Sequence, residues 1–396
     1  MWWFCLVVLY VTGTSADDTC DSHNDNGMCQ TPSKHNDYGV KWHKYVNLID
    51  AALKDYRPPS SQDDCSVHFG QLNSDLWPFR DGISKAAIED SKARGIHYQV
   101  IGHKLYRQER VLFGPRIKSV DHFILEIIDQ LPDMEFILND RDYPQVPKSW
   151  GPKPVFSFSK TKDYYDIMYP AWSFWGGGPA ISLFPTGIGR WDKLRESVAK
   201  AGDRYPWEKK QSKAFFRGSR TSAERDPLVL LSRTNPEMVD AQYTKNQAWK
   251  SLKDTLGEEP AKEVHFNDHC QYKYLFNFRG VAASFRLKHL FLCRSLVFHV
   301  GDEWLEFFYA AMQPWVHYVP VSTSLTEVRE LLEFVRTNDG AAKEIAERGF
   351  DFIWKHLRQQ DVSCYWKNLL TRYAALLKYK VKREPSLIAI TSAEGY

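Results

Sequence analysis

Short apolar runs alternate with stretches of helical periodicity along most of the chain. Apolar positions recur at helical spacing over 42–56, 120–131 and 324–335, and Ser324 with Glu327 has the spacing of a capping box. Short apolar or alternating runs between such stretches predict strands at 135–139, 154–158, 181–184, 214–216, 295–300 and 317–321. Strands separated by helices predict an α/β protein with mostly parallel sheets, in which ligands bind at the carboxyl ends of strands.

The first residues have a different pattern. Residues 1–10 are nearly all apolar and small residues precede Asp17, which predicts a secretory signal peptide over 1–16. Residues 17–40 are polar and lack periodicity, so we expect a loosely tethered arm. No later apolar run reaches the length of about 18 residues that a membrane span needs. We therefore expect a lumenal or secreted protein without a membrane span.

Composition indicates which kinds of partner the protein binds and which cellular compartment it occupies. A net charge of +3, from 52 basic and 49 acidic residues, gives no signal for nucleic-acid binding. Cys5 lies in the signal, and an even set of six cysteines remains, as expected for disulfides in an oxidising compartment. The six are Cys20, Cys29, Cys65, Cys270, Cys293 and Cys364. Their number does not fix the pairing, and Cys20 with Cys29 could close a small loop in the arm.

Two arginine-rich segments, 215–227 and 277–286, each run from an apolar strand into glycine and small residues. Backbone N–H groups and guanidinium forks in such turns are suited to phosphate. The candidates to neutralise a diphosphate are Arg217, Arg220, Arg225 and Arg286. For Arg225, pairing with nearby Glu224 or Asp226 is the simpler alternative. The two segments together indicate a phosphorylated donor.

Asp140 and Asp142 follow the strand predicted at 135–139. Their D-x-D spacing suits a divalent metal, as in many nucleotide-sugar transferases. Alternatively, one aspartate is a general base without metal, or the string is a solvated loop before a proline turn. The aromatic run 172–179 also has two possible interpretations. It is either an exposed platform on which sugars or peptides stack, or part of the hydrophobic core.

At these residues the chain closely resembles the Rumi-type protein O-glucosyltransferases, enzymes of the endoplasmic reticulum lumen. The similarity extends from about Trp42 to Tyr379. The strings that carry it are 131–135, 141–148, 156–160, the two arginine-rich segments, 243–250 and 301–308. The resemblance implies a GT-B architecture, two Rossmann-like domains facing across a cleft. The boundaries are 41–194 for an acceptor-binding domain, joined by a C-terminal helix at about 369–385, and 195–368 for a UDP-sugar-binding domain.

The resemblance also implies the reaction. The family transfers glucose, or in some members xylose, from UDP-sugar to a serine in folded EGF-like repeats with the pattern C-x-S-x-[P/A]-C, with inversion and without a metal or other cofactor. Such repeats occur in secreted and cell-surface proteins, including Notch-type receptors. Nothing in the sequence demands more than a monomer.

The resemblance assigns the site residues by position. Asp142 is implied as the base that takes the serine proton. The implied UDP-sugar contacts are Ser219, Arg225, Val281, Ala282, Ala283, Ser284, Phe285, Arg286 and Phe184. The implied acceptor contacts are Phe113, Ala180, Ile181, Ser182, Leu183, Phe184 and Pro185. The implied disulfides are Cys65–Cys364 and Cys270–Cys293.

The chain lacks two cysteine pairs that family members often have, with Pro59 and Val67, and Val111 and Ile117, at the matching positions, and it departs from the family at two further places. The loop 180–185 is one residue shorter, lacks a tryptophan and has Phe184 where tyrosine is usual. Residues 392–396 are not a K-D-E-L-like retention tail, so we expect partial secretion. These departures motivate the alternative function, a non-catalytic chaperone that binds EGF repeats. An intact Asp142 and both arginine-rich segments favour the enzyme.

Overall fold

The computed structural model describes residues 40–59, 65–176, 190–246 and 248–392. The chain divides into two compact units, 1–43 and 44–396. Of the first unit only 40–43 are described, including the short 3-10 turn Val40–Trp42. The expected signal peptide, Cys20, Cys29 and the loop 180–185 lie outside the described residues. Everything below concerns the second unit.

The first sheet has six strands in the order β11-β2-β1-β3-β4-β5. The strands are β1 Ile96–Ile101, β2 Lys104–Arg107, β3 Met134–Leu138, β4 Val155–Ser157, β5 Ile167–Met168 and β11 Ile388–Ile390. Only the β3–β4 and β4–β5 pairs are parallel. Strand β1 pairs antiparallel with both β2 and β3, and β11 pairs antiparallel with β2. This sheet is therefore mixed, whereas the pattern predicted mostly parallel strands.

The second sheet is fully parallel, in the order β10-β9-β8-β6-β7. Its strands are β6 Gln211–Gly218, β7 Val239–Tyr243, β8 Tyr272–Asn277, β9 Leu296–Val300 and β10 Val319–Val321. In chain order this is the doubly wound arrangement 2-1-3-4-5, whose topological switch point lies between the first and third strands. The carboxyl ends of β6 and β8 therefore lie side by side, and the two arginine-rich segments follow them directly.

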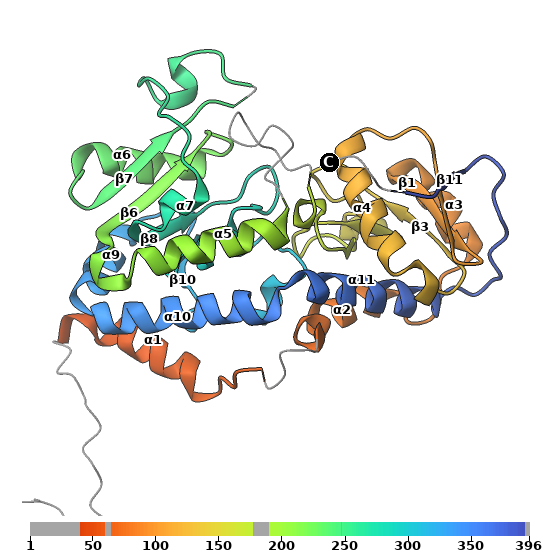
Figure 1. Cartoon of the computed structure of the whole chain (residues 1–396), viewed down its shortest axis with the longest axis horizontal. Coiled ribbons are helices and arrows are strands. Elements are labelled where there is room, and N and C mark those ends of the chain that lie inside the picture. The colour runs from red at the N-terminus through yellow and green to blue at the C-terminus, as the bar shows by residue number, and fades with distance from the viewer. Residues whose placement is uncertain (1–39, 60–64, 177–189, 247, 393–396) are drawn as a thin grey trace, which may run out of the picture. The chain divides into compact units, whose positions relative to one another are not determined.

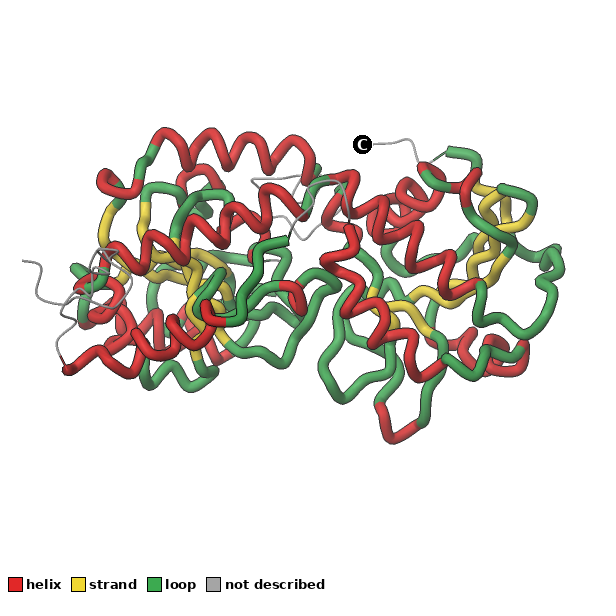
Figure 2. Tube along the Cα trace, turned by 90° about the horizontal axis from the view of Figure 1, so that it is seen from below, coloured by secondary structure: helices red, strands yellow, loops and turns green. Residues whose placement is uncertain are grey.

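Helices flank both sheets (Figures 1 and 2). The longer helices are α1 His43–Lys54, α4 Gly114–Glu126, α5 Trp191–Arg204, α9 Val328–Thr337, α10 Asp339–His356 and α11 Gln359–Ala374. The shorter helices are α2 Phe69–Leu76, α3 Lys85–Ser91, α6 Asp226–Thr234, α7 Phe266–His269 and α8 Leu287–Phe291. Helix α10 packs on β9, and α11 packs on α2 and α4. The expected α/β class with two sheets is confirmed, and the GT-B assignment stays what the family resemblance implies.

Two disulfides reinforce this core. Cys65 and Cys364 join the segment before α2 to α11 across 299 residues, and Cys270 and Cys293 join the end of α7 to the residues after α8. Both pairings are those that the family resemblance implied. In the chain-entropy model, closing a loop as long as the first stabilises the fold by roughly 5–6 kcal/mol.

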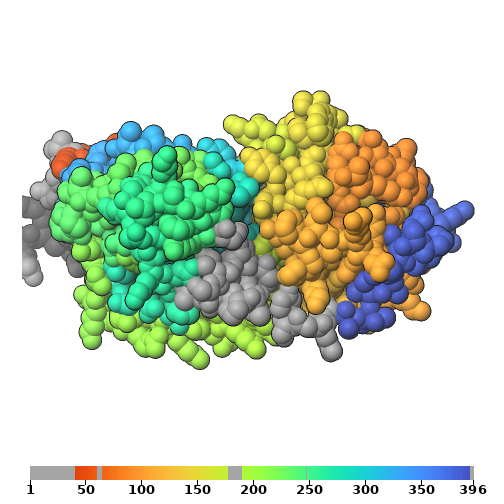
Figure 3. All heavy atoms as spheres, turned by 90° about the horizontal axis from the view of Figure 1, so that it is seen from above, coloured from red at the N-terminus to blue at the C-terminus, as the bar shows by residue number. Residues whose placement is uncertain are grey.

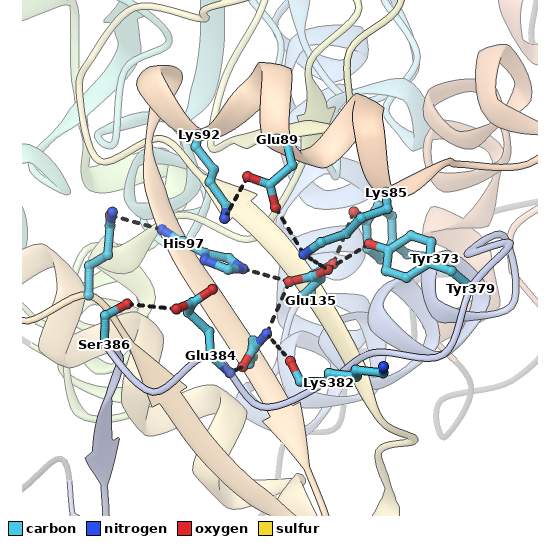
Figure 4. Close-up of polar contacts among 12 residues, drawn as sticks. Lys85, Glu89, Lys92, His97, Glu135, Tyr373, Tyr379, Lys382, Glu384 and Ser386 are labelled. Carbon is cyan, nitrogen blue, oxygen red and sulfur yellow. Dashed lines mark hydrogen bonds and ion pairs between the residues drawn. The ribbon is translucent and has the colours of Figure 1, made fainter.

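A buried carboxylate ties the C-terminal residues to the first sheet. Glu135 in β3 is fully buried and accepts hydrogen bonds from His97 Nε2 at 2.8 Å, Lys85 Nζ at 2.7 Å and Tyr379 Oη at 2.8 Å (Figure 4). Burial alone would raise the pKa of Glu135, but these donors together hold it well below its usual value. The network secures the chain between α11 and β11.

Some local expectations fail. The predicted capping box is wrong, because Glu327 accepts hydrogen bonds from Ser322 N–H at 2.6 Å and from its hydroxyl at 2.7 Å instead of pairing with Ser324. The C-terminal helix expected at about 369–385 lies earlier, at Gln359–Ala374, and extended chain follows it. The expected boundary near residue 195 falls within α5 and stays a prediction.

Candidate active site

Asp142 lies in the loop between β3 and β4, which we call the base loop (139–147). Its Oδ1 pairs with Arg116 Nη2 in α4 at 2.9 Å, and 38% of its side chain stays exposed. Arg116 Nη1 also donates to the carbonyl of Asp140 at 2.9 Å, so one guanidinium orders both ends of the D-x-D string. Asp142 is therefore held in place and still open to a substrate.

Asp140 has a different role. It is buried, and its Oδ2 accepts the backbone N–H groups of Leu112 at 3.0 Å and Phe113 at 3.1 Å, immediately before α4. The two bonds satisfy backbone N–H groups at the N-terminus of α4, where a negative charge also interacts favourably with the helix dipole. Within the described ranges, no cluster of three or more His, Cys, Asp or Glu side chains could hold a metal ion. Asp140 is therefore a structural residue, whereas Asp142 remains partly exposed.

The four candidate arginines separate into two kinds. Arg217 pairs with Asp240 at 2.7 Å, and Arg220 makes a two-pronged contact with Asp226 at 2.8 and 2.6 Å. Both charges are thus already balanced by carboxylates. Glu224 pairs with Arg279 at 2.7 Å, so neither acidic neighbour of Arg225 is its partner. The simpler alternative for Arg225 is excluded.

Arg225 and Arg286 have no carboxylate partner among the described residues. Arg225 donates to the carbonyls of Ser219 and Arg279, and its Nε has no hydrogen-bond partner there. Arg286 Nη1 is also buried without one. Burial lowers the pKa of Arg225 to about 9 and that of Arg286 to about 10. The positive charge of Arg286 contributes to the lowered pKa of Arg225. Two buried cations without a counter-charge are suited to an anion.

Gly218 lets Arg286 reach this position. A Cβ built on Gly218 would lie 2.8 Å from Arg286 Nη2 and 3.0 Å from the Phe216 ring. The guanidinium also stacks over that ring, with Cζ 5.1 Å from its centroid. The glycine at the end of β6 therefore leaves room for a cation that comes from the segment after β8.

A small hollow lies at the carboxyl ends of β8 and β9, and part of the second arginine-rich segment (277–286) lines it. Its lining is Asn277, Arg279, Ala283, Ser284, His299, Val300, Gly301, Glu303, Trp304 and Tyr309. Trp304 meets Tyr143 edge-on, with ring centroids 5.1 Å apart. Tyr143 follows Asp142 in the chain, so this contact brings the base loop to the rim of the hollow. Figure 3 shows residues of the first sheet's half, in yellow, against those of the second.

Of the remaining predicted residues, only Ala283 and Ser284 line the hollow among the described parts of the chain. In the donor turn (281–286), Val281 is exposed, Ala282 and Ala283 are buried, and Phe285 packs on Trp172 with centroids 4.6 Å apart. Ser219 Oγ lies 3.1 Å from the Thr221 hydroxyl. Phe113 is exposed beside Arg116, 4.2 Å from ring centroid to Cζ. Positions 180–185, including Phe184, lie outside the described residues.

Sequence reasoning missed Arg116 as a site residue. Nothing in the pattern around Arg116 indicates its ion pair, which depends on the tertiary contact of α4 with the base loop. Trp304 belongs to 301–306, which follow the strand predicted at 295–300 and were expected to lie where ligands bind in such a sheet. The sequence left the aromatic run open between platform and core, and Trp172 and Phe174 are fully buried and form core.

Comparison with known proteins gives consistent results. The model of glycosyl transferase family 90 matches residues 60–394. Protein O-glucosyltransferase 1 of Rattus norvegicus is 60% identical over 354 residues, covering 88% of this chain and 90% of the relative. O-glucosyltransferase rumi of Drosophila melanogaster is 54% identical over 395 residues, covering 97% and 96%. A crystal structure of Anabaena Alr3699/HepE with UDP and glucose covers 45% of this chain and 54% of that chain, with 11% identity and a TM-score of 0.33. Among the described residues no helix is long and apolar enough to cross a membrane.

Proposed function

The chain belongs to glycosyl transferase family 90, and from that premise we propose that it transfers glucose from UDP-glucose to a serine hydroxyl of folded EGF-like repeats. The observation that carries the proposal is the pair of buried guanidinium groups, Arg225 and Arg286, without a carboxylate among the described residues. They lie at the switch point of a parallel sheet, and the rim of the hollow contacts the residue after Asp142. A diphosphate site next to an open carboxylate is what such a transfer requires.

Binding of the sugar donor depends on positive charge. Arg225 and Arg286 neutralise the diphosphate of UDP, and they stabilise it further as it leaves with additional negative charge. The donor turn (281–286) and Ser219 line the same site and complete the UDP contacts. Because fixed guanidinium groups supply this stabilisation, the reaction proceeds without a metal ion.

The transfer itself is a single displacement at C1 of the sugar. The serine oxygen attacks C1 from the face opposite UDP, the bond from C1 to the UDP oxygen breaks, and UDP leaves with the electron pair. Asp142 accepts the serine proton as the new bond forms. Base assistance of this kind contributes roughly 10²- to 10⁴-fold in rate. Attack from the opposite face inverts the anomeric centre.

The acceptor side rests on exposed apolar side chains around the base. Leu112, Phe113 and Tyr143 are 63%, 41% and 48% exposed, which is unusual for such large apolar groups in one neighbourhood. They offer a surface to a folded EGF-like repeat of a secreted or cell-surface protein, such as a Notch-type receptor. The loop 180–185 completes the acceptor contacts, and the protein acts as a monomer in the lumen of the endoplasmic reticulum.

The test is a transfer assay with purified protein, a folded EGF repeat bearing C-x-S-x-P-C and UDP-glucose, in EDTA, followed by intact mass. The expected result is a gain of one hexose by the wild type and at least a 100-fold slower gain by Asp142→Asn. Asp50→Asn, the same change on exposed α1, is the matched control and should transfer normally. A gain of one pentose with UDP-xylose, and no gain with UDP-glucose, would show that the donor is UDP-xylose. Binding of the repeat without any transfer would instead support the chaperone function.

A further inference from the structure

The string 156–160 belongs to the family resemblance but has no role in the site described so far. It begins in β4 and continues beyond it, and all five residues are buried. Its polar side chains face two different partners. One set of contacts leads to the base loop, and the other leads to the residues around the hollow.

On the base side, Asp166 is the intermediate. Its buried carboxylate accepts the N–H groups of Gln145 at 2.7 Å and Val146 at 2.8 Å, both in the base loop. It also accepts the Ser157 hydroxyl at 2.6 Å. Lys160 Nζ donates to the carbonyl oxygen of the same Asp166 at 2.7 Å. Ser157 and Lys160 thus hold Asp166 in place, and Asp166 in turn holds the base loop.

On the donor side, the backbone of Lys160 pairs with Leu305 of the second sheet's half. The N–H of Leu305 donates to the Lys160 carbonyl at 2.9 Å, and the reverse bond measures 3.3 Å. Leu305 directly follows Trp304, which lines the hollow. In addition, the Ala283 N–H of the donor turn donates to Ser159 Oγ at 3.3 Å. One short segment therefore contacts both the base loop's anchor and the donor turn.

The charge of Lys160 is balanced by Asp75 in α2. The two side chains lie 2.5 Å apart, and both residues are buried. Asp75 also accepts Met168 N–H at 2.9 Å and Gln71 Nε2 at 2.7 Å. A buried ion pair of this kind is weak evidence for stability, because a neutral pair of similar size is often as stable. The bond from Lys160 to Asp166 gives the lysine a geometric role that a neutral pair would not supply.

We propose that Lys160, acting through Asp166, is a positioning residue that fixes Asp142 relative to the donor. The proposal rests on the proposed function, since it concerns the distance between the serine acceptor's base and C1 of the bound sugar. Misplacement of reacting groups by about 1 Å costs up to roughly 100-fold in rate. Loss of the Lys160–Asp166 bond should therefore lower kcat and leave donor binding unchanged.

The deciding variant is Lys160→Met with Asp75→Asn, which removes the bond to Asp166 without leaving an unpaired buried charge. The expected result is a kcat at least 10-fold lower, with the UDP Kd from calorimetry and the KM for the EGF repeat within about threefold of wild type. Asp75→Asn alone keeps the bond from Lys160 to the Asp166 carbonyl but leaves the lysine charge unpaired, so it is the control for loss of the ion pair and should have a higher kcat than the double variant. Equal kcat in the double variant and this control would overturn the proposal.

Ser157→Ala is a second variant that carries no buried charge. It removes the other bond from β4 to Asp166, and we expect a several-fold lower kcat with unchanged UDP affinity. Unchanged kcat in this folded variant would also overturn the proposal. If the wild type transferred no sugar, the proposed function would fail, whereas failure of the present inference would appear as equal kcat among proteins that all transfer.

Discussion

Replacement of Arg286 by methionine should stabilise the protein without ligand and weaken UDP binding. The guanidinium is buried beside Arg225 without a carboxylate among the described residues, and burial lowers its pKa from 12.5 to about 10. Because the pKa is lower in the folded state, the cost of the charged form is fully present at pH 7. It decreases only as the pH rises above about 10.

The magnitude follows from that difference. A change from 12.5 to about 10 corresponds to about 3 kcal/mol of unfavourable charge burial. Loss of the contact with the Phe216 ring offsets about 1 kcal/mol of this. We therefore expect Arg286→Met to raise the free energy of unfolding by about 2 kcal/mol, measured in urea with the disulfides intact. In calorimetry the UDP Kd should rise at least about 30-fold, the equivalent of about 2 kcal/mol.

Arg220→Met is the matched control for this experiment. Arg220 is the same residue type in the same segment, but its charge is already paired with Asp226 at an exposed position. Exposed pairs contribute about 1 kcal/mol or less, so stability should change little and the UDP Kd should stay within about twofold. A less stable Arg286→Met protein, or one that binds UDP as tightly as wild type, would refute the reasoning.

Three further predictions concern the residues around this site and the first sheet. Gly218→Ala places a Cβ 2.8 Å from Arg286 Nη2, so calorimetry should show a UDP Kd about 10-fold higher. Asp140→Asn weakens two bonds before α4 and should lower the free energy of unfolding in urea by about 1–2 kcal/mol, with kcat insensitive to EDTA. Glu135→Gln should lower Tm at pH 7 but remove much of the wild type's loss as the pH falls below about 4. Because the pKa of Glu135 is lower in the folded than in the unfolded state, its ionised form stabilises the protein at any pH above the unfolded-state pKa. This stabilisation is lost as the pH falls below that value, and a glutamine, which does not titrate, has no such loss.

Sequence periodicity was sufficient for the parts of the fold with a continuous apolar pattern. Strands β3, β4 and β9 are buried along most of their length, and each was predicted within two residues. Strand β7 was missed although it lies at a sheet edge and has the alternating buried and polar positions of a half-buried strand. The pairing of β11 with β2 joins segments almost 300 residues apart, and local periodicity contains no information about such a contact.

The partners and burial of the candidate site residues could not be predicted from the sequence. Four arginines looked equivalent along the chain, and only the fold distinguishes them. Asp226 is six residues from Arg220, but the partner of Arg217 is Asp240, on the neighbouring strand. Likewise, Asp140 and Asp142 lie in one short string, yet one is buried under a helix terminus and the other is open. Partner choice and burial are tertiary properties, which spacing alone does not determine.

The division of the site between two sheets has a mechanistic consequence. The proposed base belongs to the first sheet and the proposed donor contacts to the second, so their separation depends on contacts between the two. Those contacts include the Tyr143–Trp304 rings, the Ser159–Ala283 hydrogen bond and the Lys160–Leu305 backbone pair. None of these residues supplies the proton acceptor or the guanidinium groups. Substitutions at this junction should therefore affect turnover more than similar substitutions within either core, where close packing keeps each half intact.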